Sequence, residues 1–353
     1  MTKIRHPNIR ESEGRQRQTA LDIGPSLLVT SRTMIWPRGH AHAMKGHAMI
    51  WRMSPLLSCV QVSGSPVALN SSRITTSHVG KEPNITPSSD TPPFVDIHCH
   101  LLPEIDDGAV SWEETLEMAR MAVADGISTI VATPHQLGNC AGNGGDAIRQ
   151  KVADVQQFLQ QHHVPLRVLP GADVRIEPDL IPKLRSGEVL TLADRRRYVL
   201  LELPHEVYLP LDGLLSKLAA AGIRGILTHP ERNLGILGQP RMLEPLVTAG
   251  CLLQITAGAL TGTFGPQIEK FATSLVQKRL VHFVATDAHG CRTRRPLLRR
   301  AFDRVAQLLG HEAAVDLCCR NPALAVEGRD VASLPLRPRQ TGLSSWFRWN
   351  KAG

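Results

Sequence analysis

Seven short apolar runs, separated by longer stretches with helical periodicity, constrain the fold of this 353-residue chain more than any other feature. The runs are FVDIHCH, TIVATPH, RVLPGADV, YVLLELP, GILTHPE, LLQITAG and FVATDAH. Strands that alternate with helices pair in parallel, and parallel strands are buried on both faces, which explains why these runs are almost continuously apolar. The sequence therefore predicts an α/β fold of parallel β/α units, for which one barrel of about 200 to 250 residues is a common form.

The stretch SWEETLEMARMAVADG, residues 111–126, is the best marked helix. Ser111 can cap its first turn, Glu114 completes a capping box, and Gly126 can end it. We expect one face of the helix to be buried. The apolar residues of that face are Leu116, Ala119, Met121, Ala122 and Val123.

The chain divides by composition into three parts. Residues 1–93 mix Ser, Thr, Pro, Gly and basic residues without periodicity, which predicts a disordered leader. The leader holds 11 Lys and Arg against 5 Asp and Glu, and the rest of the chain holds 29 against 27, so the net charge of +8 belongs mostly to the leader. Residues 94–328 form the predicted barrel, and residues 329–353 a flexible tail with basic and aromatic residues.

This distribution of charge and hydrophobicity indicates whether nucleic acid or a membrane is an expected partner. A nearly neutral body argues against an extended phosphate-binding face, so nucleic acid is not an expected partner. No run reaches the roughly 18 to 20 uninterrupted apolar residues of a membrane-spanning helix. Trp346, Phe347 and Trp349 could rest on an anionic membrane surface, but one short aromatic patch is more often part of a soluble terminus. We therefore expect no stable membrane insertion.

The seven cysteines are scattered along the chain. No Cys-x-x-Cys pair is present, so the sequence does not indicate a cysteine zinc site or a dithiol redox centre. No cysteine is followed six positions later by arginine, which excludes a Cys-x5-Arg phosphate loop with a thiolate nucleophile. Reduced thiols and the lack of a secretory signal favour a cytoplasmic protein.

Six of the seven apolar runs end in residues that can bind metal. In DIHCH, His98 and His100 are two positions apart on a strand, so they project from one face while Cys99 points to the other. The remaining candidates are His135, Asp173, Glu202, His229, Asp287 and His289. A lone His-x-His pair is usually exposed or packed in a core, but charged groups at six strand ends would repel unless a cation lay between them. Imidazole and carboxylate ligands without thiolate suit Mn, Fe or Zn rather than Ca or Mg.

The motifs DIHCH, DDG, TPH, GAD, LELP, THPER and TDAH resemble the motif series of the polymerase and histidinol phosphatase (PHP) superfamily, over about residues 94–325. More narrowly, HCHLLPEIDDGAVSWEETLEMARMAVADGISTIVATPH is similar to the manganese-dependent bacterial protein-tyrosine phosphatases encoded with capsule and exopolysaccharide export genes. The resemblance implies a distorted seven-stranded, TIM-like β/α barrel. It also implies up to three metal ions at the carboxyl-terminal mouth, with Mn²⁺ as the cofactor and Fe or Zn as alternatives.

The resemblance further implies which residues hold each ion. The first ion would be held by His98, His100, Asp173 and Asp287, the second by Asp173, Glu202 and His229, and the third by Asp107, His135 and His289. Asp106 either joins these ligands or hydrogen-bonds the turn before Gly108.

One position departs from the family, which usually has Glu, bridging two ions, where this chain has Asp173. Aspartate is one methylene shorter. Either the backbone moves closer, or one ion is bound more weakly, or Glu177 partly compensates; we favour the first.

Two arginines match positions that contact phosphate in the family. Arg232 lies in HPER and Arg294 in CRTRRP, and a guanidinium suits bidentate contact with a phosphoryl group. Arg294 lies among several other arginines, and such a run is more often a solvated basic face. We therefore expect a catalytic role for both, more firmly for Arg232.

The expected reaction is hydrolysis of phosphotyrosine on a protein, by a hydroxide that bridges two ions and attacks phosphorus in line. The implied partner is a tyrosine-phosphorylated protein, in particular a tyrosine kinase of polysaccharide export; a homo-oligomer stays open. The first alternative is a small-molecule phosphatase of the histidinol-phosphate type or a phosphodiesterase. The second alternative is a catalytically idle metal-binding scaffold. Turnover of phosphotyrosine peptide, histidinol phosphate and oligonucleotide would separate these functions.

Overall fold

The computed structural model describes residues 91–331, so predictions for the leader and for most of the tail lie outside the described residues. The strands of this part are β1 (Phe94–Cys99), β2 (Ile127–Ala132), β3 (His135–Gln136), β4 (Arg167–Pro170), β5 (Asp173–Arg175), β6 (Tyr198–Glu202), β7 (Arg224–Thr228), β8 (Leu252–Thr256) and β9 (Phe283–Ala285). All of them pair in parallel, in the orders β1-β2-β4 and β3-β5-β6-β7-β8-β9.

The two sheets join into one barrel. Strands β2 and β3 are successive parts of one interrupted strand, and β4 and β5 are parts of another, so the nine strands occupy seven positions. The Thr133 N–H donates to the Cys99 carbonyl at 2.9 Å and carries the pairing across the first interruption. The barrel closes between β9 and β1, where the Asp287 N–H donates to the His98 carbonyl at 2.7 Å. The predicted distorted seven-stranded β/α barrel is confirmed.

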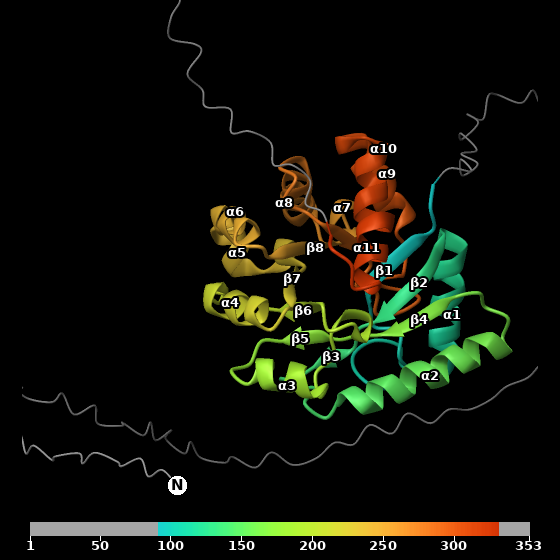
Figure 1. Cartoon of the computed structure of the whole chain (residues 1–353). Coiled ribbons are helices and arrows are strands. Elements are labelled where there is room, and N and C mark those ends of the chain that lie inside the picture. The colour runs from blue at the N-terminus through green and yellow to red at the C-terminus, as the bar shows by residue number, and fades with distance from the viewer. Residues whose placement is uncertain (1–90, 332–353) are drawn as a thin grey trace, which may run out of the picture. The chain divides into compact units, whose positions relative to one another are not determined.

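Helices follow the strands in the chain and lie around the barrel (Figure 1). Their bounds are α1 (Trp112–Asp125), α2 (Gly145–Gln161), α3 (Leu180–Ser186), α4 (Asp212–Ala220), α5 (Leu234–Gly238), α6 (Leu243–Thr248), α7 (Ala257–Leu260), α8 (Pro266–Gln277), α9 (Arg299–Leu309), α10 (His311–Val315) and α11 (Asn321–Val326). Short 3-10 turns lie at Leu192–Asp194, Pro230–Arg232 and Pro240–Met242, and a π-helical turn at Asp316–Arg320. Among the described helices, none combines the length and the hydropathy needed to cross a bilayer.

Helix α1 begins and ends where the sequence predicts. The Ser111 hydroxyl accepts a hydrogen bond from the Glu114 N–H at 3.3 Å, and Gly126 adopts a φ of 101°, the left-handed conformation that ends many helices. The capping box is only half formed, because the Glu114 carboxylate accepts from the N–H groups of Val110 and Cys291 instead of Ser111. Glu114 thus ties the start of α1 to the loop after β9.

The buried face of α1 matches the prediction only in part. Ala119 and Ala122 are buried as predicted, and so is Met118, which the prediction omitted, whereas Leu116, Met121 and Val123 are only partly buried. Burying a methionine side chain completely stabilises a fold by about 1.5 to 3 kcal/mol, so this contact is a main anchor of the helix.

An irregularity in β1 decides which side chains face the interior of the barrel. Val95 and Ile97 pack inside it with Tyr198, whereas Cys99 packs in the outer apolar layer between strands and helices. The pairing of β1 with β2 shifts register between Asp96 and Cys99. Such an irregularity changes the alternation of side chains, and it turns Cys99 outward at the end of the strand.

The last described residues close the end of the barrel where the strands begin. The Tyr198 hydroxyl donates to the Arg329 carbonyl at 2.7 Å and accepts from the Val331 N–H at 3.1 Å. Asp330 pairs with Arg197. Residues 329–331, which the prediction assigned to the tail, therefore contact the barrel.

Candidate metal centre

The nine predicted ligands converge at the carboxyl-terminal end of the strands. His98 belongs to β1, His135 to β3, Asp173 to β5 and Glu202 to β6, while His100, Asp107, His229, Asp287 and His289 lie in the segments that directly follow strands. The carboxyl ends of parallel strands meet at one rim, which explains how residues far apart in the chain form one cluster. The cluster borders a cavity of about 180 Å³.

Asp173 lies at the bottom of the cluster and faces three imidazoles. Its Oδ2 is 3.5 Å from His98 Nε2, 3.6 Å from His135 Nδ1 and 3.8 Å from His229 Nε2. Its Oδ1 accepts a hydrogen bond from the Thr228 hydroxyl at 3.4 Å. Asp173 is fully buried, so one carboxylate oxygen is shared among three neighbouring nitrogen donors without access to bulk solvent.

Asp107 marks the outer side of the cluster. Its Oδ1 is 3.4 Å from His135 Nε2 and 3.5 Å from His289 Nε2. The Asp107 side chain is 64% exposed, whereas those of His98, His100 and Asp173 are 0% exposed, so the cluster extends from the buried floor of the cavity to solvent.

Four sets of donor atoms lie close enough to share an ion. They are His98, His100 and Asp287; His98, Asp173 and His229; His135, Asp173 and Glu202; and His100, Asp107, His135 and His289. The grouping differs from the prediction in several respects. Glu202 lies with Asp173 and His135, not with His229. Asp173 lies with His98 and His229 but not in the set of His100 and Asp287, and His100 also joins the set of Asp107.

The charges of the cluster are strongly coupled. Burial by itself disfavours the charge of Asp287, but His98, His229 and the two arginines hold the pKa of this carboxyl well below its usual range. Burial also disfavours protonation of His98, yet Asp287 and Asp173 raise its pKa to about 9. The carboxylates of Asp287 and Asp173 therefore favour a positive charge on His98.

The pKa of Glu202 is shifted in the opposite direction from that of Asp287. Burial and the nearby charge of Asp173 raise its pKa to about 7. The positive charge of the side chains therefore does not fully compensate the carboxylates at this end of the cluster, and a divalent cation would.

Two buried atoms of the cluster have unsatisfied bonding capacity. His135 Nδ1 and Asp173 Oδ2 make no hydrogen bond within the described part of the chain. Buried polar atoms without partners are rare in folded proteins and require an explanation. These atoms and the purely nitrogen and oxygen donor set fit a divalent transition metal.

Asp106 orients a histidine and does not itself face the cavity. Its Oδ2 accepts from His100 Nδ1 at 2.7 Å and from the His135 N–H at 3.0 Å, and its Oδ1 accepts from the Gly108 N–H at 2.9 Å. The prediction that Asp106 hydrogen-bonds the turn before Gly108 is confirmed. A carboxylate on one ring nitrogen leaves the other nitrogen, here Nε2 of His100, free to bind metal.

Gln254 plays the same part for His98 of β1, and sequence reasoning missed it. Its Oε1 lies 2.9 Å from His98 Nδ1, and its side chain is fully buried. The available signal was an amide in the middle of the otherwise apolar run LLQIT. A buried amide inside a parallel strand requires a polar partner in the barrel.

Both predicted arginines reach the cluster. Arg232 and Arg294 each pair with Asp287 Oδ2, Arg294 through Nη2 at 2.5 Å. The Arg232 guanidinium also lies over the ring of Phe264, 4.8 Å from its centroid. Phe264, which no pattern in the sequence indicated, holds Arg232 at the mouth of the cavity by a cation–π contact.

The backbone of the site is held in uncommon conformations. His229, Asp287 and Arg294 have positive φ angles of 33°, 51° and 47°. Such angles cost free energy in residues with a Cβ and persist when the surrounding structure determines them. They direct the three side chains into the cavity.

Two expectations about nearby residues have different outcomes. Cys99 is fully buried and burial raises the pKa of its thiol well above the usual value, which fits a packed core residue and not a nucleophile. Glu177 accepts a hydrogen bond from the Gly138 N–H at 2.9 Å and lies 3.5 Å from Lys183 Nζ. Because the strand ends at Arg175, Glu177 points away from the cluster and does not compensate for Asp173.

Residues 94–327 match the family described as capsular polysaccharide synthesis, CpsB/CapC. The chain belongs to this family. The match spans the whole barrel and includes every residue of the cluster.

Characterised proteins agree with this assignment. The chain is 37% identical to the tyrosine-protein phosphatase YwqE of Bacillus subtilis over 247 residues, which are 69% of this chain and 96% of YwqE. It is 29% identical to the tyrosine-protein phosphatase CpsB of Streptococcus pneumoniae over 235 residues, 65% of this chain and 96% of CpsB.

A crystal structure agrees as well. It comes from work on YwqE from Bacillus subtilis and CpsB from Streptococcus pneumoniae, described as unique metal-dependent tyrosine phosphatases. It superposes with a TM-score of 0.67 and 36% identity, covering 69% of this chain and 98% of the other.

Proposed function

We propose that this protein is a metal-dependent protein-tyrosine phosphatase, a phosphoric monoester hydrolase acting on tyrosine-phosphorylated protein. The observation that carries the proposal is the convergence of nine imidazole and carboxylate side chains around one cavity with two arginines paired to Asp287 at its mouth. The activity named for YwqE and CpsB supports it.

We propose Mn²⁺ as the ion, with Fe or Zn as alternatives, and up to three ions. The ligands are His98, His100, Asp107, His135, Asp173, Glu202, His229, Asp287 and His289. Divalent ions supply Lewis acidity: they lower the pKa of water and neutralise charge on phosphoryl oxygens. Asp173, which belongs to two of the donor sets, would be the ligand shared between ions. Asp106 and Gln254 hold His100 and His98 in the orientation that presents Nε2.

The arginines bind the phosphoryl group. Asp287 Oδ1 lies 3.3 Å from His98 Nε2 and would hold the ion. The guanidinium groups of Arg232 and Arg294, which pair with Asp287 Oδ2, would offer their remaining N–H groups to the equatorial phosphoryl oxygens. Bidentate contact from both would orient the phosphorus for attack by water. Tyrosinate leaves readily, because a phenol with a pKa of about 10 is a better leaving group than an alkoxide.

We further propose that the substrate is a tyrosine kinase of capsular or exopolysaccharide export and that the protein acts in the cytoplasm. The family description, capsular polysaccharide synthesis, supports the first part. The described cysteines are unpaired thiols, which suits a reducing compartment and supports the second part. A homo-oligomer is compatible with this function and is not required by it.

The test is a substrate panel with metal control. We expect the purified full-length chain to hydrolyse phosphotyrosine peptide in the presence of Mn²⁺, to lose turnover in EDTA, and to recover it when Mn²⁺ is added in excess. Iodoacetamide should leave the rate unchanged, because the described site contains no thiol.

The same panel includes histidinol phosphate and a single-stranded oligonucleotide. Faster turnover of either of these than of phosphotyrosine peptide would replace the proposal by a small-molecule phosphatase or a phosphodiesterase. Full metal content without turnover of any substrate would indicate an idle metal-binding scaffold.

A further inference from the structure

A second cavity, of about 540 Å³, adjoins the metal centre. It lies between the connection from α7 to α8, the loop after β9 and the first residues of α9. Arg294 lines both cavities. Its Nη2 pairs with Asp287, but its buried Nε makes no hydrogen bond to any described residue. The guanidinium of Arg294 is therefore the point at which the two cavities meet.

The lining of this second cavity is basic and rich in hydroxyl groups. It includes Arg292, Arg294, Arg295 and Arg300 together with Thr256, Thr261, Thr263, Thr286 and Thr293. No carboxylate is among the described residues that line it. We name this cavity the arginine pocket.

Three of the four arginines of the arginine pocket are not neutralised by an ion pair, and Arg294 is the exception. Arg292, Arg295 and Arg300 make no ion pair with any described residue, whereas thirteen of the other described basic side chains, five of them histidines, do. Glu114, the acidic neighbour of Arg292, instead binds the N–H groups of Val110 and Cys291. The pocket thus presents a surplus of positive charge beside the metal centre.

The buried atoms of the pocket include one guanidinium nitrogen without a partner. Arg294 Nε makes no hydrogen bond to any described residue. The Thr256 hydroxyl, in a residue that is only 1% exposed, interacts with the Glu231 carboxylate, which also accepts from the Thr256 backbone N–H at 2.9 Å. Buried polar groups almost always have a partner, and a ligand oxygen in the pocket would supply one for Arg294 Nε.

We propose that the arginine pocket binds an anionic group of the protein substrate, a carboxylate or a second phosphate, that lies within a few residues of the phosphotyrosine. This inference rests on the proposed phosphatase function and names the class of sequence that the site prefers. Guanidinium groups bind carboxylate and phosphate in the same bidentate manner, so the two sources share one chemistry. An extended peptide rises about 3.3 Å per residue, which lets a neighbouring side chain enter the adjoining cavity.

The test compares three phosphotyrosine peptides that differ only in their flanking residues: neutral flanks, two glutamates, and a second phosphotyrosine. With Mn²⁺ present, we expect the full-length chain to show a higher kcat/KM for both anionic peptides than for the neutral one. Losing one charge-assisted hydrogen bond changes an equilibrium constant about tenfold. The kcat/KM for an anionic peptide should therefore exceed the kcat/KM for the neutral peptide about tenfold. The two anionic peptides separate carboxylate from phosphate as the preferred group.

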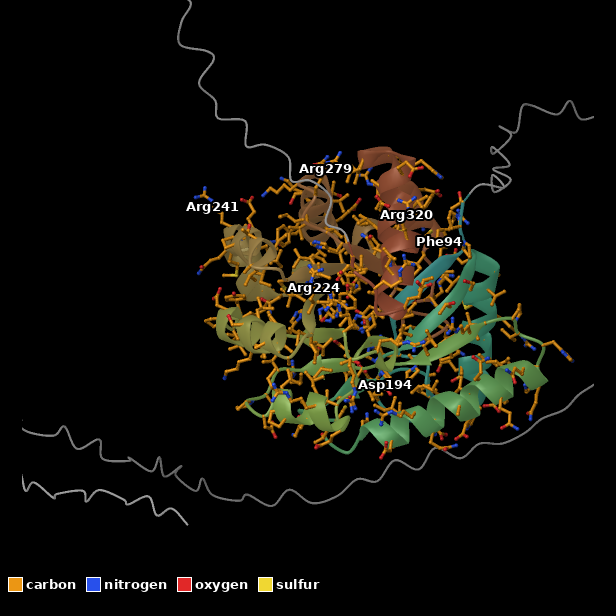
Figure 2. All side chains as sticks on the ribbon, in the orientation of Figure 1. Phe94, Asp194, Arg224, Arg241, Arg279 and Arg320 are labelled. Carbon is orange, nitrogen blue, oxygen red and sulfur yellow. The ribbon has the colours of Figure 1, made fainter. Side chains whose placement is uncertain are left out.

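The variant Arg292→Gln/Arg295→Gln removes two exposed charges of the pocket without touching Asp287. We expect it to lower the anionic-to-neutral ratio to about one, mainly through KM. The matched control is Arg241→Gln, since Arg241 is exposed and lies at the outer edge of the described unit, away from the pocket (Figure 2). The control should keep the ratio of the unmodified chain.

Three outcomes would overturn the inference: no preference for anionic peptides in the unmodified chain, an unchanged preference in the double variant, or an equal loss in the control. If no phosphotyrosine peptide is hydrolysed at all, the proposed function fails separately. Fluorescence anisotropy of a labelled peptide with two phosphotyrosines, measured in EDTA, then tests whether the arginine pocket binds the peptide. Its Kd should rise about tenfold in the double variant, and an equal Kd would reject the pocket.

Discussion

Asp173 is the residue on which the proposed metal centre depends most. It is fully buried, and its Oδ2 lies within 3.8 Å of imidazole nitrogens from β1, β3 and the end of β7. The shorter side chain, relative to the glutamate usual in the family, still reaches all three. Adjustment of the backbone to the missing methylene stays a prediction.

We expect Asp173→Ala to lose nearly all turnover together with bound metal. Removing a partner of a metal ligand alone lowers affinity about 10- to 100-fold, so removing a shared ligand should exceed about 100-fold. Asp173→Glu should be tolerated with a modest change in Mn²⁺ affinity and a destabilisation of about 1 to 3 kcal/mol from the added methylene in a packed site. Metal content and kcat would be measured for both variants.

Glu177→Ala is the control for this pair, because Glu177 contacts Gly138 and Lys183 outside the cluster. It should keep the Mn²⁺ affinity of the unmodified chain. Full metal content and unmodified kcat in Asp173→Ala would show that another group is shared between the ions.

At the scale of elements, the turn from the end of β1 to α1 supplies both Asp107 and the carboxylate that orients His100. Because Gly108 has no side chain, this turn can pack directly against the His100 backbone. A Cβ on Gly108 would lie 2.3 Å from the His100 carbonyl oxygen and 2.9 Å from Asp106 Oδ1, closer than any stable contact. The glycine is required because the chain packs against its own strand at this point.

Gly108→Ala should therefore separate Asp106 from His100 and lower Mn²⁺ affinity about 10- to 100-fold, as expected when a ligand loses its orienting carboxylate. Isothermal titration with Mn²⁺ would measure the effect. Gly213→Ala in α4 is the matched control, because a Cβ there meets nothing within 4 Å. It should leave affinity unchanged and stabilise the helix by about 0.5 to 1 kcal/mol. Equal Mn²⁺ affinities of the two variants would contradict this account of the turn.

At the scale of the whole described unit, the two ends of the barrel have different roles. The carboxyl-terminal ends of the strands hold the polar cluster, while the opposite end is closed by apolar side chains and by residues 329–331. This separation lets stability and chemistry be altered independently.

The substitution Tyr198→Phe tests whether the stability of the barrel can be changed without changing its catalysis. The hydroxyl of this fully buried side chain bonds the Arg329 carbonyl and the Val331 N–H, and its loss leaves both groups without that partner. We expect a loss of about 1 to 3 kcal/mol of stability, or roughly 2 to 4 °C in Tm per kcal/mol. Thermal unfolding would measure it, and kcat should stay unchanged because the metal centre is at the other end. A kcat that falls while Tm is unchanged would reject the separation.

Much of the fold follows from the sequence alone. The seven apolar runs predicted the seven strand positions of the barrel, and Ser111 and Gly126 predicted the ends of α1. These features depend on interactions that are local in the sequence. A parallel strand is buried on both faces, a hydroxyl side chain accepts from free N–H groups at the start of a helix, and a glycine adopts the left-handed conformation that ends a helix. Most of the proposed ligands could also be chosen from the sequence, because they stand at the ends of the runs, whereas Asp107 was indicated only by the resemblance to the family.

Only the tertiary structure decided how those residues combine. Glu202 lies with His135 rather than His229, and Gln254 orients His98 from a strand that carries no ligand. The register shift in β1 determined which side chains face inward. Contacts of this kind join residues more than 30 positions apart, and they depend on how seven strands close into one barrel. No local pattern carries that information, because a strand's own residues do not determine what its neighbours bring to the rim.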